Sequence, residues 1–588
     1  MVHHTALPCI AALLLLEIIP FAVSHGGDHG EGAAIIQTAK FTHMSSSTNV
    51  TNDAEQSYFA YPHYMGLMLG HIGLMTVAWC FVLPVGVMLS VGRSRLAVLV
   101  QLSFLCLHSI GLLLGVIYTG KTPKLYESNV HGKIGWIVTW LVLLQCVTGL
   151  VKLATSFTLP KPKEDEQRPF LPITTEALER YEEAQPYRYS NDSGHFTASD
   201  ISRSQSISST REHNEEAEQR KLREYYDSHV DAEANCIGKK NGLFINDKIQ
   251  KFASYMSARF SNRTLRVLNT FHNIIDCTSL PFGFVAILSG AVVYGGIFHG
   301  RNIFNGLAHS IKGGIFFWYG LLTLGRWMGC FAEMGWAWNV RPPVGVVTPR
   351  KVRIPSAEFV ESLVIFLYGA SNVWLEHLAA WGSAWSAQDF EHVSISIMFF
   401  GGGLCGMLVE SRRVRDFLNT AIVTSPAAYG PPNTRELLMP PKTYAHSMNP
   451  FPALIILLLG LMMSSHHQSS MVSTTVHKQW GMLFVGFALA RAVTYILMYI
   501  SPPTSYLPSR PPSELISSFC LISGGLIFIA SNRDTVSAME HHGLHAMFPF
   551  TVTMGFTAFL MAWAVIVLAV KGWAAGRQVG SDSLSGRN

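Results

Sequence analysis

Long apolar runs separated by polar connections dominate the chain. A helix needs about 20 predominantly apolar residues to cross the hydrocarbon core of a bilayer, and about eleven stretches approach or exceed that length. The pattern therefore predicts an all-α fold, a polytopic transmembrane helical bundle. The predicted stretches are 62–90, 95–119, 132–154, 269–298, 304–329, 357–382, 389–410, 449–466, 475–500, 513–531 and 546–570.

A shorter apolar segment precedes these runs. It covers residues 6–23, and Ala22-Val23-Ser24 supplies the small residues that signal peptidase prefers. We therefore predict a signal peptide over residues 1–24 and entry into the secretory pathway, followed by a histidine-containing lumenal or extracellular segment, 25–61. A retained N-terminal helix is the alternative, because about 18 apolar residues border on spanning length.

Basic connections predict the orientation. Those around residues 93–95, 341–353 and 412–415 are rich in arginine and lysine, so the positive-inside rule places them in the cytoplasm. With eleven helices, the mature N-terminus is then lumenal or extracellular, and the tail, 574–588, is cytoplasmic. On the lumenal side, the sequon at Asn49 is the predicted glycosylation site.

One long polar segment interrupts the apolar pattern. Residues 156–265 are rich in Glu, Arg and Ser, which predicts a largely disordered cytoplasmic loop. Such a loop offers a binding region for unknown cytoplasmic proteins, although a solvated linker is the simpler interpretation.

Composition narrows the classes of partner and chemistry. Only 14% of the residues are charged, and the net charge is +5. The basic residues lie beside apolar segments, so the predicted partner is the lipid bilayer and nucleic acid is not. The sequence has no GxGxxG or P-loop motif, which disfavours a nicotinamide- or ATP-dependent enzyme.

Four successive apolar stretches in the N-terminal half each contain one histidine that we single out. A histidine left unpaired inside lipid is costly, and facing helices that each supply an imidazole are what a bis-histidine haem needs. The pattern therefore indicates haem ligands, with interhelical hydrogen bonding without haem as the alternative. The four residues are His71, His108, His131 and His272.

Residues 62–155 and 266–330 resemble the transmembrane cytochrome b561 group of electron carriers. The resemblance rests on His71 with Leu-Met at 74–75, on Leu-Pro-x-Gly at 83–86, and on the placement of the later histidines. It implies two b-type haems. His71 and His131 would hold one, with their imidazoles about 8 Å or less apart, and His108 and His272 would hold the other.

Residues 356–573 closely resemble the C-terminal domain of the fungal YTP1-like family of membrane proteins. The family implies a fungal source and carries no established chemistry, so function has to be inferred from the residues. The resemblance is carried by residues 366–377, 466–471, 477–481, 531–535 and 540–545.

Histidines and one glutamate gather at the predicted lumenal helix ends of this half. Imidazole and carboxylate together suit transition metals, so these residues predict a divalent transition-metal site if at least three converge from two or more helices. Interfacial polar groups that titrate in an acidic compartment are the alternative. The candidate ligands are Glu376, His377, His466, His467, His477, His541, His542 and His545.

Three charged residues lie inside the apolar stretches. Because an unpaired charge in the membrane costs several kcal/mol, we predict that Glu361 pairs with Arg326 and Arg491, with a transport pathway as the alternative.

Three functions remain open at this stage. The first is transmembrane electron transfer through a di-haem core toward a lumenal metal, which would make the chain an oxidoreductase. The second is haem-free metal handling or sensing, and the third is a scaffold whose cytoplasmic loop binds partners.

Overall fold

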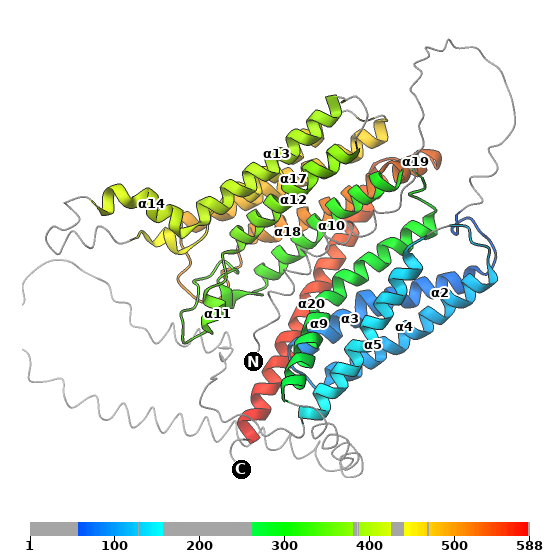
Figure 1. Ribbon diagram of the computed structural model, residues 1–588, viewed down its shortest axis with the longest axis horizontal. Coiled ribbons are helices and arrows are strands. Elements are labelled where there is room, and N and C mark those ends of the chain that lie inside the picture. The colour runs from blue at the N-terminus through cyan, green and yellow to red at the C-terminus, as the bar shows by residue number, and fades with distance from the viewer. Residues whose placement is uncertain are drawn as a thin grey trace, which may run out of the picture. The chain divides into compact units, whose positions relative to one another are not determined.

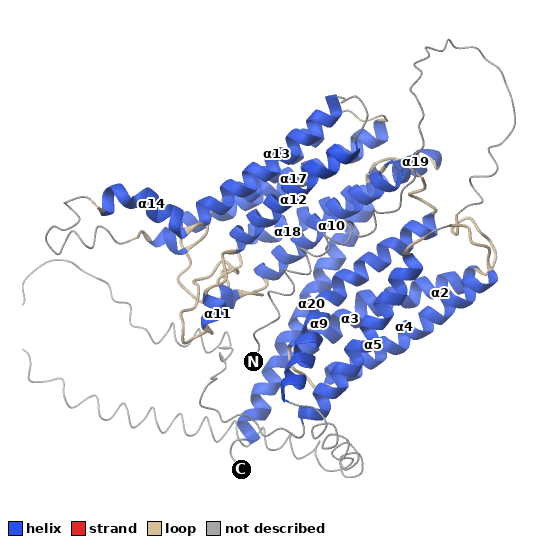
Figure 2. Cartoon of the chain, viewed as in Figure 1, coloured by secondary structure: helices blue, strands red, loops and turns tan. Residues whose placement is uncertain are grey.

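The computed structural model describes most of the chain outside the N-terminal segment and the long polar loop. The predicted signal peptide, Asn49 and nearly all of the predicted loop 156–265 lie outside the described residues, so the expectations for them stay predictions. Within the described part the regular structure is helical, and no strand occurs (Figure 2). The described residues are 57–126, 129–156, 262–300, 302–379, 385, 387–424, 440–466, 468 and 470–585.

The helices follow the apolar stretches of the sequence (Figure 1). The long ones are α2 (Met65–Thr76), which continues through a π-helical segment (Val77–Val82) into α3 (Leu83–Val91), then α4 (Leu96–Lys121), α5 (His131–Ser156), α9 (Asn262–Gly295), α10 (Asn302–Trp327), α12 (Ala357–Ala379), α13 (Ala387–Glu410), α16 (Phe451–Ser465), α17 (Met471–Ile500), α18 (Pro512–Ala530) and α20 (Met547–Ser585). Shorter helices are α11 (Pro349–Val352), α14 (Arg412–Val423) and α19 (Arg533–His541).

Each of the eleven predicted stretches coincides with a helix or a continuous helical run. Eight of these, within the described residues, are long and apolar enough to cross a membrane, which confirms an all-α polytopic membrane protein. The other three helices do not meet that length and hydropathy. Charged and histidine residues lower the hydropathy of α10 and α12, and α16 has only 15 residues. The total of eleven spans stays a prediction. The predicted tail 574–588 begins as a continuation of α20, which extends to Ser585.

The chain divides into two compact units, one formed by residues 1–144 with 273–588 and the other by residues 145–272. Within the first unit, α2 and α3 pack against α4, and α20 packs against both α3 and α18. In its C-terminal part, α10 and α17 both pack against α18, α16 packs against α17, and α12 packs against α13. The described part of the second unit consists of the last turns of α5 and the first turns of α9.

Glycines bring α10 and α18 into backbone contact. A Cβ atom on Gly313 would lie 2.6 Å from the Gly525 carbonyl oxygen, and a Cβ on Gly525 would lie 2.6 Å from the Gly313 carbonyl oxygen. Small residues at helix crossings are the usual means of close packing in a bilayer, where apolar side chains gain little by leaving lipid. The pair allows α10 and α18 to pack with their backbones in contact.

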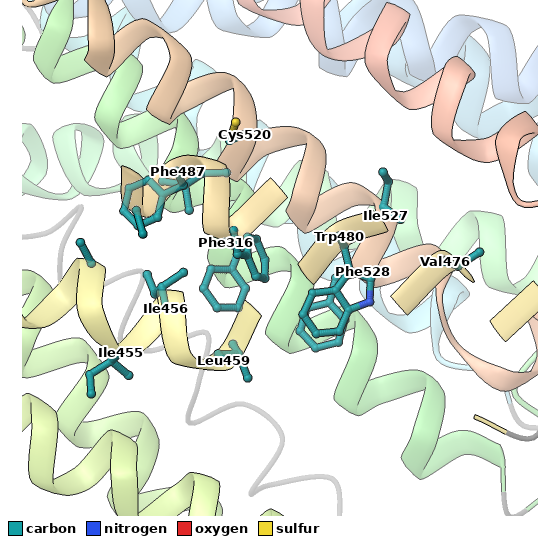
Figure 3. Packing of buried hydrophobic residues seen from close by; sticks show 14 of the residues in the cluster. Phe316, Ile455, Ile456, Leu459, Val476, Trp480, Phe487, Cys520, Ile527 and Phe528 are labelled. Atoms are coloured by element: carbon teal, nitrogen blue, oxygen red, sulfur yellow. The ribbon is translucent and has the colours of Figure 1, made fainter. Parts of the chain in front are cut away.

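Aromatic side chains fill the core beside this crossing (Figure 3). The indole of Trp480 on α17 stacks on Phe528 of α18, with ring centroids 4.3 Å apart and planes 20° apart. Phe316 of α10 packs on Phe484 of α17 at 4.2 Å. Trp480 and Phe484 are fully buried, so aromatic contacts join α10, α17 and α18 in the core.

Candidate functional site

His71 lies on α2 and faces α4. Its Nδ1 atom is 2.8 Å from the carbonyl oxygen of Gly111. A carbonyl oxygen can only accept, so Nδ1 carries the proton, and Nε2 of the neutral ring keeps its lone pair. The position of the ring therefore fixes its tautomer.

His131, the first residue of α5, is held in an equivalent way by α9. Its Nδ1 atom is 3.0 Å from the hydroxyl oxygen of Ser289. That hydroxyl donates a hydrogen bond to the Ala286 carbonyl at 2.9 Å, so it accepts a hydrogen bond from the histidine. Nε2 of His131 therefore also keeps a lone pair in the neutral ring.

The two imidazoles form a facing pair. Their ring centroids are 6.4 Å apart, and their planes are inclined by 80°. Two bonds of ~2 Å to one metal, plus the distance from each nitrogen to its ring centre, give a separation of about 6 Å for two axial imidazoles. The ring of His131 also hydrogen-bonds the backbone of Ala286. Metal-bound histidines usually donate their other ring N–H to an oxygen, as both Nδ1 atoms do here.

Glycines provide the room that the two rings occupy. A Cβ on Gly115 of α4 would lie 2.8 Å from Nδ1 of His71, and a Cβ on Gly290 of α9 would lie 3.0 Å from Cε1 of His131. On α5, Gly132 and Gly135 have no atom within 4 Å of the Cβ position, so the surface next to His131 is open. The residues present therefore fit a bis-histidine group.

His108, buried on α4, is placed differently. The indole N–H of Trp79 donates to its Nδ1 at 3.3 Å, and its Nε2 is 3.0 Å from the hydroxyl oxygen of Thr139. Thr139 donates to the Gly135 carbonyl, so Nε2 of His108 is the donor to Thr139 and carries the proton. Both ring nitrogens are thus engaged, and this arrangement does not fit an axial ligand of iron.

Trp79 owes its position to the π-helical segment. It is buried, and its ring lies edge-on to His108 with centroids 5.7 Å apart. The ring occupies the space beside Gly283, where a Cβ would approach it to 2.3 Å. Such π-helical segments often mark functional sites, and here the segment places a side chain against His108.

His272, the fourth predicted haem ligand, lies in the second unit. Its Nδ1 atom is 2.9 Å from the hydroxyl oxygen of Thr148, and the ring is buried. His108 belongs to the first unit, so the predicted His108–His272 pair stays a prediction.

A second facing pair occurs in the C-terminal half, between His309 of α10 and His477 of α17. Their ring centroids are 5.9 Å apart, with planes inclined by 87°. Nδ1 of His309 lies 3.1 Å from the Phe528 carbonyl, and Nδ1 of His477 lies 2.8 Å from the Ser473 carbonyl. By the same argument, Nε2 keeps its lone pair on both neutral rings.

The predicted lumenal metal ligands are only partly described. His466 lies 3.7 Å from the Glu391 carboxylate, and the adjacent His541 and His542 rings at the end of α19 have centroids 5.0 Å apart. Among the described residues no group of three or more His, Cys, Asp or Glu side chains is placed to hold a metal ion. The convergence of three ligands therefore stays a prediction. His467 and the side chains of Glu376 and His377 lie outside the described part, and His545 lies just before α20.

The predicted pairing of Glu361 is confirmed. Arg326 Nη1 donates to the Glu361 carboxylate at 2.6 Å, and Arg491 Nη1 does so at 3.4 Å. Sequence reasoning missed two further carboxylates in this cluster, Glu358 and Glu514. Both lie in the first turn of a helix, where an acidic residue reads as an ordinary helix start.

His309 was also missed by the sequence reasoning. Its stretch is interrupted by Lys312 and several glycines, and His477 was grouped with histidines nearby in the sequence. The sequence did contain a signal for the pair. His309 and His477 each lie near the start of a predicted span, and the predicted topology gives these two spans the same direction, so both histidines are expected near the same side of the membrane.

Comparison with known proteins identifies two matching families. Residues 282–572 match the family described as Protein YTP1-like, C-terminal, and residues 52–155 match a Domain of unknown function (DUF2427).

Three relatives show how far the similarity extends. An uncharacterized membrane protein of Schizosaccharomyces pombe is 35% identical over 538 residues, which is 91% of this chain and 99% of that protein. An uncharacterized membrane protein of Saccharomyces cerevisiae is 38% identical over 348 residues, which is 56% of this chain and 51% of its own length. The protein YTP1 of Saccharomyces cerevisiae is 22% identical over 308 residues, which is 52% of this chain and 55% of that protein. No solved structure matches the chain significantly.

Proposed function

The chain belongs to the YTP1-like family of membrane proteins, and we propose that it is a membrane haem protein whose N-terminal helices hold one b-type haem between His71 and His131 for electron transfer. The observation that carries the proposal is the facing pair itself. Both rings have their tautomer fixed with Nε2 unprotonated, and the centroids are 6.4 Å apart. A metal ion held between the two rings would engage both of these lone pairs.

Each surrounding residue has a defined part in this proposal. The Gly111 carbonyl and the Ser289 hydroxyl orient the two rings. A haem there would be held by His71 and His131 and would supply a one-electron carrier, which suits electron transfer.

We propose one haem rather than the two implied by the cytochrome b561 resemblance. His108 donates through Nε2 and accepts through Nδ1, so it offers no lone pair to iron while Trp79 and Thr139 hold it. His71 lies in the first part of the continuous helical run Met65–Val91, and His131 begins α5. With the predicted orientation, the haem would lie on the lumenal or extracellular side of a secretory-pathway membrane.

The experiment is a reduced-minus-oxidised visible spectrum of the full-length chain purified from membranes. We expect a b-type band and a haem-to-protein ratio near one. His71→Ala and His131→Ala should each abolish the band, whereas His108→Ala and the exposed control His63→Ala should keep it. A wild-type chain without the band, or variants of His71 and His131 that retain it, would refute the proposal. A ratio near two with a band reduced by half in His108→Ala would restore the di-haem alternative.

Metal handling is a second candidate function, favoured by the His309–His477 pair. Both rings again keep an unprotonated Nε2, and the centroid separation of 5.9 Å is close enough for one ion to contact both. Imidazole ligands suit copper, zinc, nickel or iron. Elemental analysis of the wild type and of the double variant His309→Ala/His477→Ala tests it. We expect loss of a non-haem metal, and unchanged metal content would rule the site out.

A further inference from the structure

The helix α14 is amphipathic, and its apolar side is largely exposed. Apolar residues recur along it at the three- and four-residue spacing that places them on one side of a helix. The exposed fraction reaches 75% at Phe417, 77% at Leu418 and 65% at Ile422. Such a continuous exposed apolar side marks a contact with another apolar surface. Its members are Val414, Phe417, Leu418, Ala421 and Ile422.

The opposite side of α14 is polar and basic. Three arginines and one aspartate, Asp416, give the helix a net charge of +2. At 100° per residue, Arg413 and Arg415 lie at the two borders of the apolar side, and Arg412 lies on the polar side between them. Arginines at such borders can keep their apolar stems against acyl chains while the guanidinium groups reach the headgroups. The charge pattern therefore complements an anionic surface that lies directly beside an apolar layer.

The position of α14 in the chain places it at the boundary of the membrane. The preceding helix, α13, is one of the helices long and apolar enough to cross a bilayer, over Asp389–Glu410. Only Ser411 separates the two helices (Figure 1), and its extended backbone, with φ −68° and ψ 117°, breaks the helical path. The 12 residues of α14 would reach only about 18 Å, well short of the ~30 Å of hydrocarbon. The helix therefore begins where a membrane span ends and is too short to cross the membrane itself.

Two contacts hold the first turn of α14 at the end of that span. Arg415 Nη2 donates to the Glu410 carbonyl at 3.4 Å, and the last carbonyls of a helix lack partners within the helix. The same guanidinium lies 5.4 Å from the ring centroid of Tyr444, which is 45% exposed. Tyrosine rings are enriched at the headgroup level of membranes. These contacts keep α14 close to the level at which α13 leaves the hydrocarbon.

We propose that α14 binds the anionic lipid surface of the membrane that the chain itself spans. Its apolar side lies among the outer ends of the acyl chains, and its arginines contact the negatively charged headgroups. The predicted orientation places this surface on the cytoplasmic side, because residues 412–415 belong to a basic connection. The proposal does not depend on haem binding at His71 and His131.

A groove on another protein is a poorer occupant than lipid. It would have to cover Phe417 and Leu418 within eight residues of the end of a membrane span, where the bilayer already offers an apolar layer. The acidic headgroups beside that layer also match the arginines at the borders of the apolar side. One lipid surface thus meets both the apolar and the basic requirements of α14.

Photo-cross-linking of the full-length chain in nanodiscs of phosphatidylcholine and phosphatidylserine identifies the occupant. A photoreactive p-benzoylphenylalanine at Phe417 should link to lipid, seen as a lipid mass added to the peptide that contains it. The matched control carries the same residue at Val423, which is apolar and 55% exposed but lies on the polar side of the helix. It should give much less lipid adduct. A link from position 417 to another part of the chain or to a second copy, or equal lipid labelling from both positions, overturns the proposal.

The composition of the linked lipid tests the role of charge. From position 417 the wild-type helix should link phosphatidylserine in excess of its share of the bilayer. Each arginine near an anionic surface strengthens the attraction by about fivefold, so Arg412→Gln/Arg413→Gln should lose most of that excess. Arg533→Gln, at an exposed arginine on α19, is the control and should keep it. Labelling in proportion to bulk composition by the wild type, or an unchanged excess in the double variant, would show that α14 does not select anionic lipid.

Discussion

Substitution of Gly115 by alanine tests whether the His71 imidazole is held for a ligand. The added Cβ would lie 2.8 Å from Nδ1 and 3.0 Å from Cε1 of His71, whereas ordinary contact begins at 3.4 Å. The ring must therefore move by about 0.6 Å away from α4, the difference between 3.4 and 2.8 Å. That movement lengthens its 2.8 Å hydrogen bond to the Gly111 carbonyl, which lies on the same helix.

The magnitude follows from the role of that hydrogen bond. Loss of the group that orients a metal-bound histidine typically lowers affinity 10- to 100-fold, or about 1.4–2.8 kcal/mol of binding free energy. Alanine also favours the helix by about 1 kcal/mol over glycine, so Gly115→Ala should not destabilise α4 itself. We therefore expect weaker haem binding by a chain that still folds.

Titration of haem into apoprotein in detergent, followed in the visible spectrum, measures the affinity. Gly120→Ala is the matched control, because it lies on the same helix with no atom within 4 Å of the Cβ position. It should bind haem like the wild type. Equal affinities in Gly115→Ala and Gly120→Ala would show that the His71 ring tolerates displacement, and the reasoning from the facing pair would be wrong.

Two further predictions concern the fold and the topology. Gly525→Val should lower the free energy of unfolding by about 1–3 kcal/mol or more, and the unfolding temperature with it. The reason is that its Cβ would lie 2.6 Å from two backbone atoms, the Gly313 oxygen and the Phe317 nitrogen. Gly555→Val on α20, which has open space, should have little effect in the same melt. Asn49→Gln should remove the entire glycosidase-sensitive shift in electrophoretic mobility. The sequons at Asn191 and Asn262 are predicted to be cytoplasmic, so a shift that remains from either of them would invert the predicted orientation.

The apolar pattern predicted the helices because bilayer thickness imposes a length that any sequence must satisfy. The apolar pattern was a weaker signal of membrane spans at α10 and α12, because these helices carry charges such as Arg326 and Glu361 within otherwise apolar runs. The pairing of those two residues was predictable, since a membrane charge requires a partner. Glu358 and Glu514 were missed because both lie in the first turn of a helix, where an acidic residue is ordinary and does not indicate a buried ion pair.

The candidate site was predicted only in part, for a different reason. Residue identity suggested His71 and His131, but their tautomers depend on a carbonyl and a hydroxyl from other helices. His108 looked equivalent in sequence, yet the neighbouring Trp79 and Thr139 engage both of its nitrogens. The difference arises from interhelical geometry, to which a single sequence gives no direct access.

The polar residues of α10 lower its hydropathy below that of a typical membrane span, although the helix is long enough to cross the membrane. His309 and Arg326 are 17 residues apart, which is about 26 Å along a helix axis and close to the thickness of the hydrocarbon core. Each has partners on other helices, His477 on α17 for the first and Glu358 and Glu361 on α12 for the second. The two clusters thus lie at opposite ends of one helix, and the cost of placing polar groups in lipid is offset at both ends. The predicted orientation, with the basic connection 341–353 in the cytoplasm, would place the arginine cluster toward the cytoplasm and the His309–His477 pair toward the lumen.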